Sequence, residues 1–135
     1  MRVGIAGGGG FVGLAIAEAL LAKGLRVRLI DINPPPEAAL HYLGEHAARE
    51  AVEVQVADIV NAQAAKQALE GVDRVVLAAA VTSAAERERD HPRQTLSVNL
   101  MGFTCLLEAA RDIGADRVVN LSSASAYGAA GFEGA

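Results

Sequence analysis

A run of four glycines between a short apolar strand and a helix is the feature that most constrains this fold. Gly7 to Gly10 follow the β-branched segment Arg2 to Ala6 and precede Phe11 to Ala22, whose apolar face is built largely from small residues. Glycines in such a turn let the backbone approach a phosphate closely, and the N-terminus of the helix supplies free N–H donors and a positive dipole end. The run therefore predicts a nucleotide-binding strand–turn–helix unit.

The spacing of the glycines is ambiguous. Gly8, Gly10 and Gly13 fit the G-x-G-x-x-G pattern, whereas Gly7, Gly10 and Gly13 fit G-x-x-G-x-x-G. The two patterns share two glycines and differ in the first, so the run alone does not decide between them. No lysine follows the run, which excludes a P-loop nucleotidase.

Short β-branched segments alternate with longer alanine- and leucine-rich segments along the whole chain. Near-continuous apolar strands indicate burial on both faces of a sheet, and strand–helix alternation indicates parallel strands joined by crossover helices. The pattern predicts an α/β fold, a doubly wound parallel sheet of the Rossmann type, truncated after the fifth strand. The expected strands are Arg2 to Ala6, Arg26 to Asp31, Val52 to Ala57, Arg74 to Ala78 and Arg117 to Leu121, and the expected helices are Phe11 to Ala22, Glu37 to Arg49, Asn61 to Glu70 and Pro92 to Asp112.

The last of these helices carries an apolar stripe with a polar residue beside it. Five residues recur at three- and four-residue spacing, which predicts that this stripe faces the sheet. Asn99 is a polar residue that lies next to this stripe. The stripe consists of Leu96, Leu100, Phe103, Leu107 and Ala110.

Length, charge and composition exclude several classes of function. The 135 residues suit one domain, residues 1–135, with no second, substrate-binding domain. The net charge of -4, without a basic stripe, argues against a nucleic-acid partner. No apolar run approaches the roughly 18 residues of a membrane helix, and no signal peptide is recognisable, so we expect a cytoplasmic protein and no membrane. The single cysteine, Cys105, and three scattered histidines predict neither a disulfide nor a metal site.

An acidic residue at the end of the second strand indicates which dinucleotide the fold would bind. Asp31 lies 18 residues beyond Gly13, close to the roughly 20-residue offset at which an acid binds a ribose 2′-hydroxyl. A carboxylate accepts hydrogen bonds from the ribose diol and repels a 2′-phosphate, so NAD is favoured over NADP. The alternative is that Asp31 only begins an Asx turn into Pro34 to Pro36.

Three further groups of residues follow predicted strands, where ligands bind in open α/β sheets. Asp58 follows the third strand, Ala78 to Ala80 the fourth, and Ser122 and Ser123 the fifth. Taken singly, these residues are equally typical of a helix cap, of packing and of a polar strand end. Together with Gly7 and Asp31, Asp58 and the three alanines predict one wall of a dinucleotide site, and the serine hydroxyls at a strand tip can hydrogen-bond a substrate oxygen.

In combination these segments resemble the NAD-dependent epimerase/dehydratase family of the extended short-chain dehydrogenase/reductase superfamily. Six segments match in order over essentially the whole chain: "AGGGGFVG", "LID", "ADI", "LAAA", "VNLMG" and "LSSASAYG". The family uses G-x-x-G-x-x-G, which makes Gly7, Gly10 and Gly13 the significant glycines and implies that Gly8 and Gly9 are tolerated rather than required. The resemblance implies a small-molecule substrate such as a sugar nucleotide, and a homodimeric parent protein.

The resemblance also implies roles for individual residues. Ser123, four residues before Tyr127, matches the catalytic serine or threonine that orients the reacting hydroxyl, whereas Tyr127 matches a structural tyrosine. The residues implied to bind or border the cofactor are Gly7, Gly10, Phe11, Val12, Gly13, Asp31, Asn33, Asp58, Ile59, Ala78, Ala79, Ala80, Asn99 and Ser122.

One family motif is absent from these 135 residues. The catalytic tyrosine of the family belongs to Y-x-x-x-K, and neither Tyr42 nor Tyr127 is followed by lysine four positions later. We therefore expect the N-terminal, NAD-binding piece of an oxidoreductase, epimerase or dehydratase that is inactive by itself. Two alternatives remain open: a non-catalytic dinucleotide sensor or regulator, and a steroid or sugar-acid dehydrogenase on the same fold.

Overall fold

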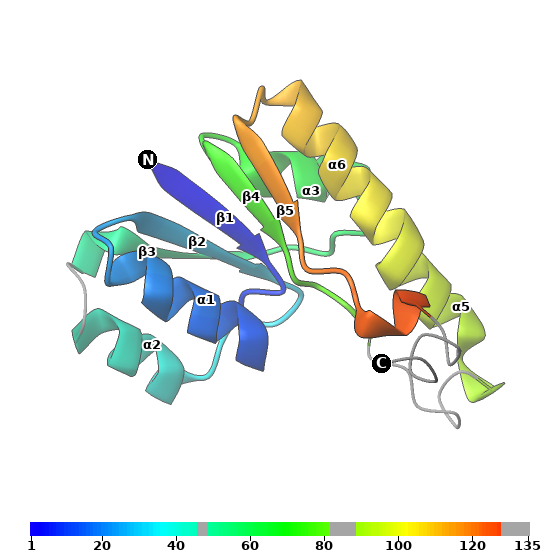
Figure 1. Ribbon diagram of the computed structural model, residues 1–135, viewed down its shortest axis with the longest axis horizontal. Helices are drawn as coiled ribbons and strands as arrows, with labels where there is room; N and C mark the ends of the chain where they lie inside the picture. Colours follow the sequence, from blue (N-terminus) through cyan, green and yellow to red (C-terminus); the bar gives the residue numbers. More distant parts are fainter. Residues whose placement is uncertain (46–48, 82–88, 128–135) are drawn as a thin grey trace.

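The computed structural model describes residues 1–45, 49–81 and 89–127 (Figure 1). Its five strands form one parallel sheet in the order β3-β2-β1-β4-β5. This arrangement confirms the doubly wound α/β fold, because the chain steps outward from β1 in one direction and then, after β3, in the other. The strands are β1 (Arg2–Ala6), β2 (Arg26–Asp31), β3 (Val52–Val56), β4 (Arg74–Leu77) and β5 (Arg117–Asn120).

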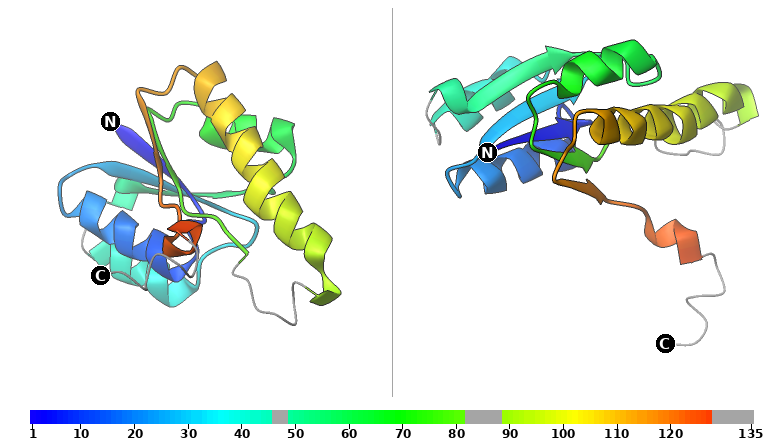
Figure 2. Two further views of the ribbon diagram at one scale, coloured as in Figure 1. Left: turned by 45° about the vertical axis from the view of Figure 1, so that its right-hand side comes forward. Right: turned by 90° about the horizontal axis from the view of Figure 1, so that it is seen from above.

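Helices cover both faces of the sheet (Figure 2). Leu29 and Ile30 are adjacent in β2, and strand alternation sends their side chains into different cores. Leu29 packs in a core with α1 and α2, whereas Ile30 packs in a core with α3 and α6. The helices are α1 (Phe11–Leu21), α2 (Glu37–Glu45), α3 (Ala62–Leu69), α5 (Pro92–Leu96) and α6 (Phe103–Asp112), with short 3₁₀ helices at Arg49–Ala51 and Ala124–Tyr127. No helix among the described residues is both long enough and apolar enough to cross a membrane.

The predicted elements match the observed ones closely, apart from the long helix. Strands β1 and β2 have the predicted bounds, and β3, β4 and β5 each end one residue earlier. The helix predicted over Pro92 to Asp112 contains a π-helical segment, Ser97–Gly102, between α5 and α6. Residues 46–48, at the end of the predicted second helix, lie outside the described residues.

The face that the long helix turns toward the sheet differs from the prediction. Leu96 and Leu100 are 61% and 57% exposed, and Leu107 is also exposed, so the leucine stripe does not pack on the sheet. Of its members, Ala110 is buried and Phe103 is half-buried. The buried face consists of Leu106 and otherwise of small residues, because short side chains let the helix approach the sheet closely. The residues of this face are Gly102, Cys105, Leu106, Ala109 and Ala110.

An arginine cluster around Glu53 joins the strands near their amino ends. The Glu53 carboxylate accepts hydrogen bonds from Arg2 Nη2 at 2.6 Å and Arg28 Nε at 2.9 Å, and Arg26 Nη2 lies 3.6 Å away. Arg28 Nη1 also donates to the carbonyl oxygens of Ala68 and Glu70. Arg28 is thereby held away from Asp31 at the other end of the same strand.

Candidate functional site

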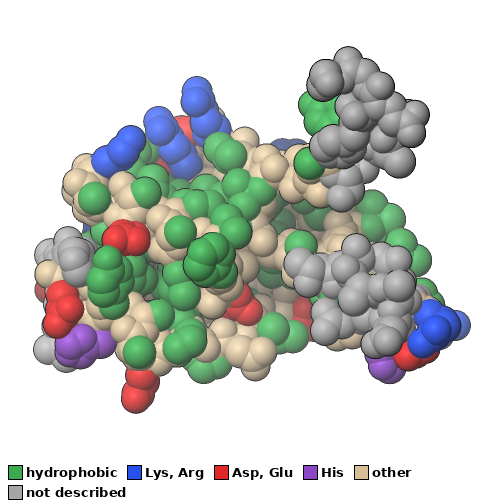
Figure 3. All heavy atoms as spheres, turned by 60° about the horizontal axis from the view of Figure 1, so that its bottom comes forward, with side chains coloured by type: hydrophobic (Ala, Val, Ile, Leu, Met, Phe, Trp, Pro, Cys, Tyr) green, Lys and Arg blue, Asp and Glu red, His purple; other side chains and the backbone are tan. Residues whose placement is uncertain are grey.

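The carboxyl ends of the strands border two adjoining cavities. The first, of about 250 Å³, lies beside the ends of β1, β2, β3 and β4, and the second, of about 520 Å³, lies beside β4 and β5. Figure 3 views this end of the molecule, where hydrophobic side chains cover much of the surface and acidic ones are visible in the hollow. Both cavities are lined by Ile59, Ala78, Ala79 and Ala80, so together they form one extended groove.

The glycine turn is bonded to the neighbouring strand β2. The N–H groups of Gly7 and Gly8 both donate to the carbonyl oxygen of Ile30, at 2.8 and 3.1 Å. Gly7 has a φ of +80°, and a Cβ there would lie 2.6 Å from the backbone nitrogen of Ala79. A Cβ on Gly13 would overlap the carbonyl oxygen of Gly7. Glycine is therefore required at both positions by the backbone itself, before any ligand is considered.

Gly8 is also required, and the prediction that it is tolerated is wrong. A Cβ on Gly8 would lie 2.7 Å from the Cα of Leu29 and 2.8 Å from the carbonyl oxygen of Ile5. Neither backbone atom can rotate away as a side chain would. At Gly10, by contrast, a Cβ would meet only the Gly7 oxygen at 3.4 Å, so the fold leaves room there. A pattern of spacing cannot reveal this difference, because it depends on which strand lies beneath the turn.

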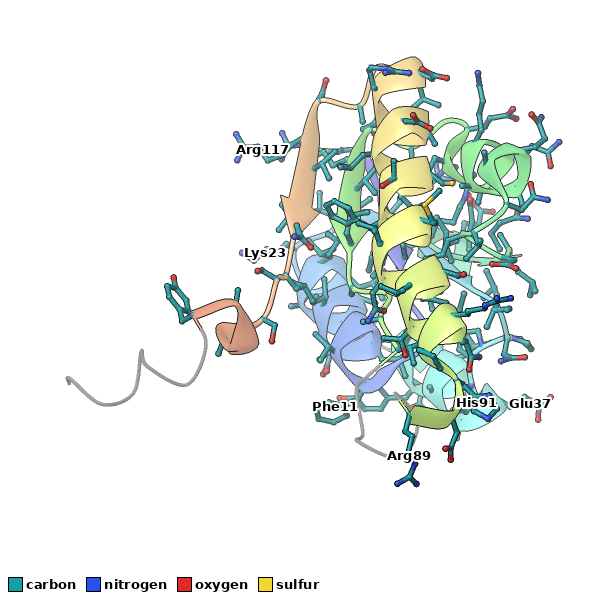
Figure 4. The ribbon with its side chains drawn as sticks, turned by 90° about the vertical axis from the view of Figure 1, so that its right-hand side faces the viewer. Phe11, Lys23, Glu37, Arg89, His91 and Arg117 are labelled. Carbon is teal, nitrogen blue, oxygen red and sulfur yellow. The ribbon has the colours of Figure 1, made fainter. Side chains whose placement is uncertain are left out.

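The N-terminus of α1 opens toward the groove. Gly10 precedes the helix without a side-chain cap, and Gly7 and Gly10 line the first cavity. The first N–H groups of a helix have no partner within it, so those of Phe11 and Val12 are available to an anion. The side chain of Phe11 is 91% exposed (Figure 4), and Val12 lines the second cavity.

Asp31 lies at the tip of β2 and holds the glycine turn. Its Oδ2 accepts a hydrogen bond from the N–H of Gly9 at 3.0 Å, and its Oδ1 lies 3.5 Å from the N–H of Asn33. The carboxylate lines the first cavity. Asn33 is exposed and is not among the described residues that line either cavity.

Asp58 and Ile59 form the next part of the first cavity. Asp58 Oδ1 accepts a hydrogen bond from the N–H of Val60 at 3.0 Å, which closes an Asx turn before α3. The cap of α3 is Asn61, whose Oδ1 accepts from the N–H of Ala64. Asp58 is therefore not the cap residue, and its carboxylate lines the cavity beside the buried side chain of Ile59.

The segment after β4 is bonded to the long helix through Asn99. The N–H of Val81 donates to Asn99 Oδ1 at 2.8 Å, and Asn99 Nδ2 donates to the carbonyl oxygen of Val81 at 2.9 Å. Asn99 lies in the π-helical segment and lines the second cavity. Its side chain thus holds the end of the Ala78 to Val81 segment, which borders both cavities.

Ser122 and Ser123 line the second cavity at the end of β5. Ser122 has a φ of +57°, an uncommon conformation for a serine, and its N–H lies 3.4 Å from Asn120 Oδ1. The 3₁₀ helix that follows stands away from the rest of the molecule (Figure 2). Tyr127, at its end, is 82% exposed and is not among the described residues that line the cavity.

Several cavity residues were not identified from the sequence. Gln94 and Val98 line the first cavity from the long helix, four residues apart on one helical face. That spacing is the only sequence signal for them: Val98 by itself resembles an ordinary core residue, and Gln94 by itself resembles an exposed polar residue. The others are Ile30, Ile32, Ala57 and Val81 in the first cavity, and Leu77, Phe103, Leu106, Asn120, Leu121 and Ala126 in the second.

Metal chemistry has no support in the described part of the chain. No group of three or more histidine, cysteine, aspartate or glutamate side chains there could hold a metal ion. Cys105 is a buried free thiol whose sulfur lies 3.7 Å from the carbonyl oxygen of Val60.

Curated relatives include both steroid-related and sugar-nucleotide proteins. The chain is 37% identical to the sterol demethylase protein B of Methylococcus capsulatus over 92% of its own length and 35% of that protein's. It is 33% identical to a UDP-glucose 4-epimerase of Mycolicibacterium smegmatis, over 95% of this chain and 41% of that protein. The chain therefore spans between a third and a half of the length of these relatives.

Solved structures and a family model give the same assignment. A UDP-glucose-4-epimerase from Stenotrophomonas maltophila, crystallised with NAD and formylated UDP-arabinopyranose, superposes with a TM-score of 0.82 at 27% identity, covering 95% of this chain and 38% of that one. The family model described as the NAD dependent epimerase/dehydratase family matches residues 3–133. This chain belongs to the NAD-dependent epimerase/dehydratase family.

Proposed function

We propose that this chain forms the NAD-binding part of an enzyme that moves hydride between a substrate carbon bearing a hydroxyl and the nicotinamide ring. The observation that carries the proposal is the hydrogen bond between Gly9 and Asp31, which joins the glycine turn to the tip of β2 inside the groove. It brings a phosphate-binding turn and a ribose-binding carboxylate together, as an adenine dinucleotide requires.

The residues along the groove suit the successive parts of NAD. Asp58 and Ile59 would border the adenine, Asp31 would accept hydrogen bonds from the adenosine ribose, and Gly7, Gly10 and Gly13 would admit the pyrophosphate. The N–H groups of Phe11 and Val12 would donate to it. Bound NAD would supply hydride acceptance and donation at the nicotinamide. The residues beside that half of the groove would be Ala78, Ala79, Ala80, Asn99 and Ser122.

Ser123 is the proposed catalytic residue of this chain. Its hydroxyl would orient the reacting hydroxyl of the substrate and stabilise negative charge developing on that oxygen. General acid–base catalysis also needs a group that removes the proton. None of the 135 residues forms a Y-x-x-x-K pair, and these 135 residues by themselves would bind NAD without turnover.

The proposed substrate class is a sugar nucleotide or another hydroxyl compound. One solved neighbour has formylated UDP-arabinopyranose bound, and another is a complex with UDP. A second candidate is a steroid alcohol, because one relative, from Mycolicibacterium neoaurum, is named 3-beta-hydroxysteroid dehydrogenase and is 32% identical over 92% of this chain. Both classes require the same hydride transfer at a hydroxyl-bearing carbon.

A homodimer is proposed for the parent protein. Leu96, Leu100 and Met101 are each more than half exposed on one helix, and Leu107 continues the apolar surface on α6. An exposed apolar surface of this kind is typical of a protein interface. A second copy of the same helix would cover it by a two-fold, self-complementary contact.

Cofactor binding provides the direct test of the function. NAD and NADP are titrated into the purified chain by calorimetry or by NMR chemical-shift perturbation. We expect NAD to bind and NADP to bind at least about tenfold more weakly, because the 2′-phosphate would meet the Asp31 carboxylate. Equal affinity for both would contradict the role of Asp31, and failure to bind either would contradict the proposed function.

A further inference from the structure

We propose that Gln94, on α5, is an adenine-recognition residue that pairs with the polar edge of the base. The inference rests on the NAD-binding function proposed above and adds a contact from the long helix, on the other side of the cavity from β2 and β3. It stands on the position of Gln94 on its helix and on the chemistry of the first cavity.

The position of Gln94 continues the sheet-facing side of the long helix. Gly102 lies on the sheet-facing side of the helix, where a Cβ added to it would lie 2.8 Å from the side chain of Ile59. Val98 and Gln94 are four and eight residues earlier, on the same helical face. In Figure 1, α5 extends past the ends of the strands, and Figure 4 shows His91 and Phe11 at one end of the molecule and Arg117 at the other. Gln94 therefore faces the first cavity rather than the sheet.

The walls of that cavity suit a flat aromatic base. Branched aliphatic residues line it at the end of β2, in the segments that follow β2, β3 and β4, and on the long helix, around about 250 Å³ of space. Such an apolar surface packs against a ring but does not fix the orientation of the ring in the cavity. The aliphatic lining residues are Ile30, Ile32, Ile59, Val81 and Val98.

Gln94 adds the donor that the other polar side chains in the cavity lack. The polar side chains of its described lining are Asp31, Asp58 and Gln94. Ionised carboxylates only accept hydrogen bonds, whereas a carboxamide both donates and accepts. Among the described residues no hydrogen bond occupies the Gln94 side chain, while Asp31 and Asp58 are each partly engaged by backbone N–H groups.

Adenine presents an edge that matches a carboxamide. Its N6 amino group donates and the neighbouring ring nitrogen N7 accepts, and glutamine pairs with both atoms at once. The Gln94 carbonyl would accept from N6, and its amino group would donate to the ring nitrogen. Hypoxanthine carries an oxygen in place of the amino group, so the same edge would lose its donor, and the oxygen would face the Asp58 carboxylate.

The test compares NAD with nicotinamide hypoxanthine dinucleotide on the full 135-residue chain and on variants. We expect Gln94→Leu to weaken NAD binding by about 5- to 20-fold, the effect of losing one or two hydrogen bonds. The same substitution should weaken binding of the hypoxanthine analogue less, so the ratio of the affinity for NAD to the affinity for the analogue should fall. Gln67→Leu, the same change at an exposed position of α3, is the control and should leave both affinities unchanged.

A second variant keeps the test decisive if the leucine variant fails to fold. Gln94→Asn retains the carboxamide and withdraws it by one methylene, so it should also weaken NAD binding while thermal unfolding stays that of the parent chain. If folded Gln94→Leu, or folded Gln94→Asn, binds NAD as tightly as the control variant, the inference is overturned. Absence of NAD binding to the unaltered chain would instead overturn the proposed function.

Discussion

Asn99 and Val81 are joined by two hydrogen bonds, in which the Asn99 carboxamide accepts from the Val81 N–H at 2.8 Å and donates to the Val81 carbonyl at 2.9 Å. The pair connects the segment after β4 to a π-helical turn of the long helix. π-Bulges occur often at functional sites. The two hydrogen bonds thus fix the position of the segment after β4, which lines both cavities of the groove.

Replacing Asn99 should loosen that wall. Asn99→Ala removes both bonds, each worth about 0.5–1.5 kcal/mol net, and we expect a lower free energy of unfolding and weaker NAD binding. Asn99→Asp keeps the acceptor but sets a carboxylate oxygen against the Val81 carbonyl oxygen, and this repulsion should make its effect resemble that of alanine. Urea unfolding and NAD titration measure the two consequences. Gln67→Ala is the control, since Gln67 is exposed on α3 and its side chain makes no hydrogen bond to the described residues. If Asn99→Ala behaves like this control, the pair has no positioning role.

The charge of Asp31 should determine the choice between NAD and NADP. Asp31→Asn keeps an oxygen that can accept from the Gly9 N–H while it removes the charge that repels a 2′-phosphate. We expect the ratio of NAD to NADP affinity to fall by about tenfold or more, since a like-charge contact costs several kcal/mol. Calorimetric titration of both cofactors measures the ratio. An unchanged ratio would mean that another group selects the cofactor.

Replacing Gly8 should cost more stability than replacing Gly10. Gly8→Ala places a methyl group against the backbone of β1 and β2, and such overpacking costs about 1–3 kcal/mol or more. Gly10→Ala should cost less stability, because its space is open. Gly44→Ala, in α2 with nothing within 4 Å of the added Cβ, should be neutral or stabilising. Thermal unfolding of the three variants gives the order, and equal losses at Gly8 and Gly10 would refute the packing argument.

The Glu53 cluster should make the free energy of unfolding decrease at acidic pH. Burial of Glu53 opposes ionisation, but its hydrogen bond with Arg28 and the charges of Arg28, Arg2 and Arg26 outweigh this and lower its pKa from the ordinary 4.5. A carboxyl with a lowered pKa in the folded state stabilises the fold above its unfolded-state pKa. That stabilisation is lost as the pH falls below about 4.5 through the folded-state pKa.

Glu53→Gln should therefore lower stability at neutral pH and flatten its decline in acid. Urea unfolding between neutral pH and pH of about 3 measures both effects. Glu108→Gln, at an exposed position on α6, is the control and should leave the acid dependence of the parent chain intact. If Glu53→Gln and Glu108→Gln decline in parallel with the parent, the cluster does not contribute to acid sensitivity.

The exposed leucines of the long helix should govern self-association. Leu100→Asp places a charge at the centre of the exposed apolar surface, where Leu100 is 57% exposed, and burying that charge in a dimer would be costly. We expect a shift toward monomer in sedimentation velocity, with little change in thermal unfolding of the monomer. Val54→Asp, on the exposed edge strand β3, is the control. Equal association of both variants would place the interface elsewhere.

The fold and the order of the site segments could be predicted from local patterns. Strands such as Arg26–Asp31 are recognisable because they are short, β-branched and buried on both faces, and Asp31 is recognisable from its distance to Gly13. These features depend on residues close in sequence.

Features that depend on contacts between distant segments could not be predicted. The leucine stripe of the long helix has the expected period but faces outward, because smaller residues such as Ala109 allow the tighter contact with the sheet. The requirement for Gly8 comes from Leu29 in the neighbouring strand, and Gln94 enters the cavity only because α5 reaches past the strand ends.

The hydrogen bond between Gly9 and Asp31 has an evolutionary consequence. The Asp31 carboxylate, which is proposed to bind the ribose, also accepts a hydrogen bond from the glycine turn that is proposed to bind the phosphates. A lineage that acquired a preference for the phosphorylated dinucleotide by replacing Asp31 with a residue that cannot accept a hydrogen bond from the Gly9 N–H would disturb the turn in the same step. We expect such a switch to need a compensating substitution near Gly9. Cofactor preference should therefore change less readily in this chain than in one whose cofactor-selecting residue makes no contact with the turn.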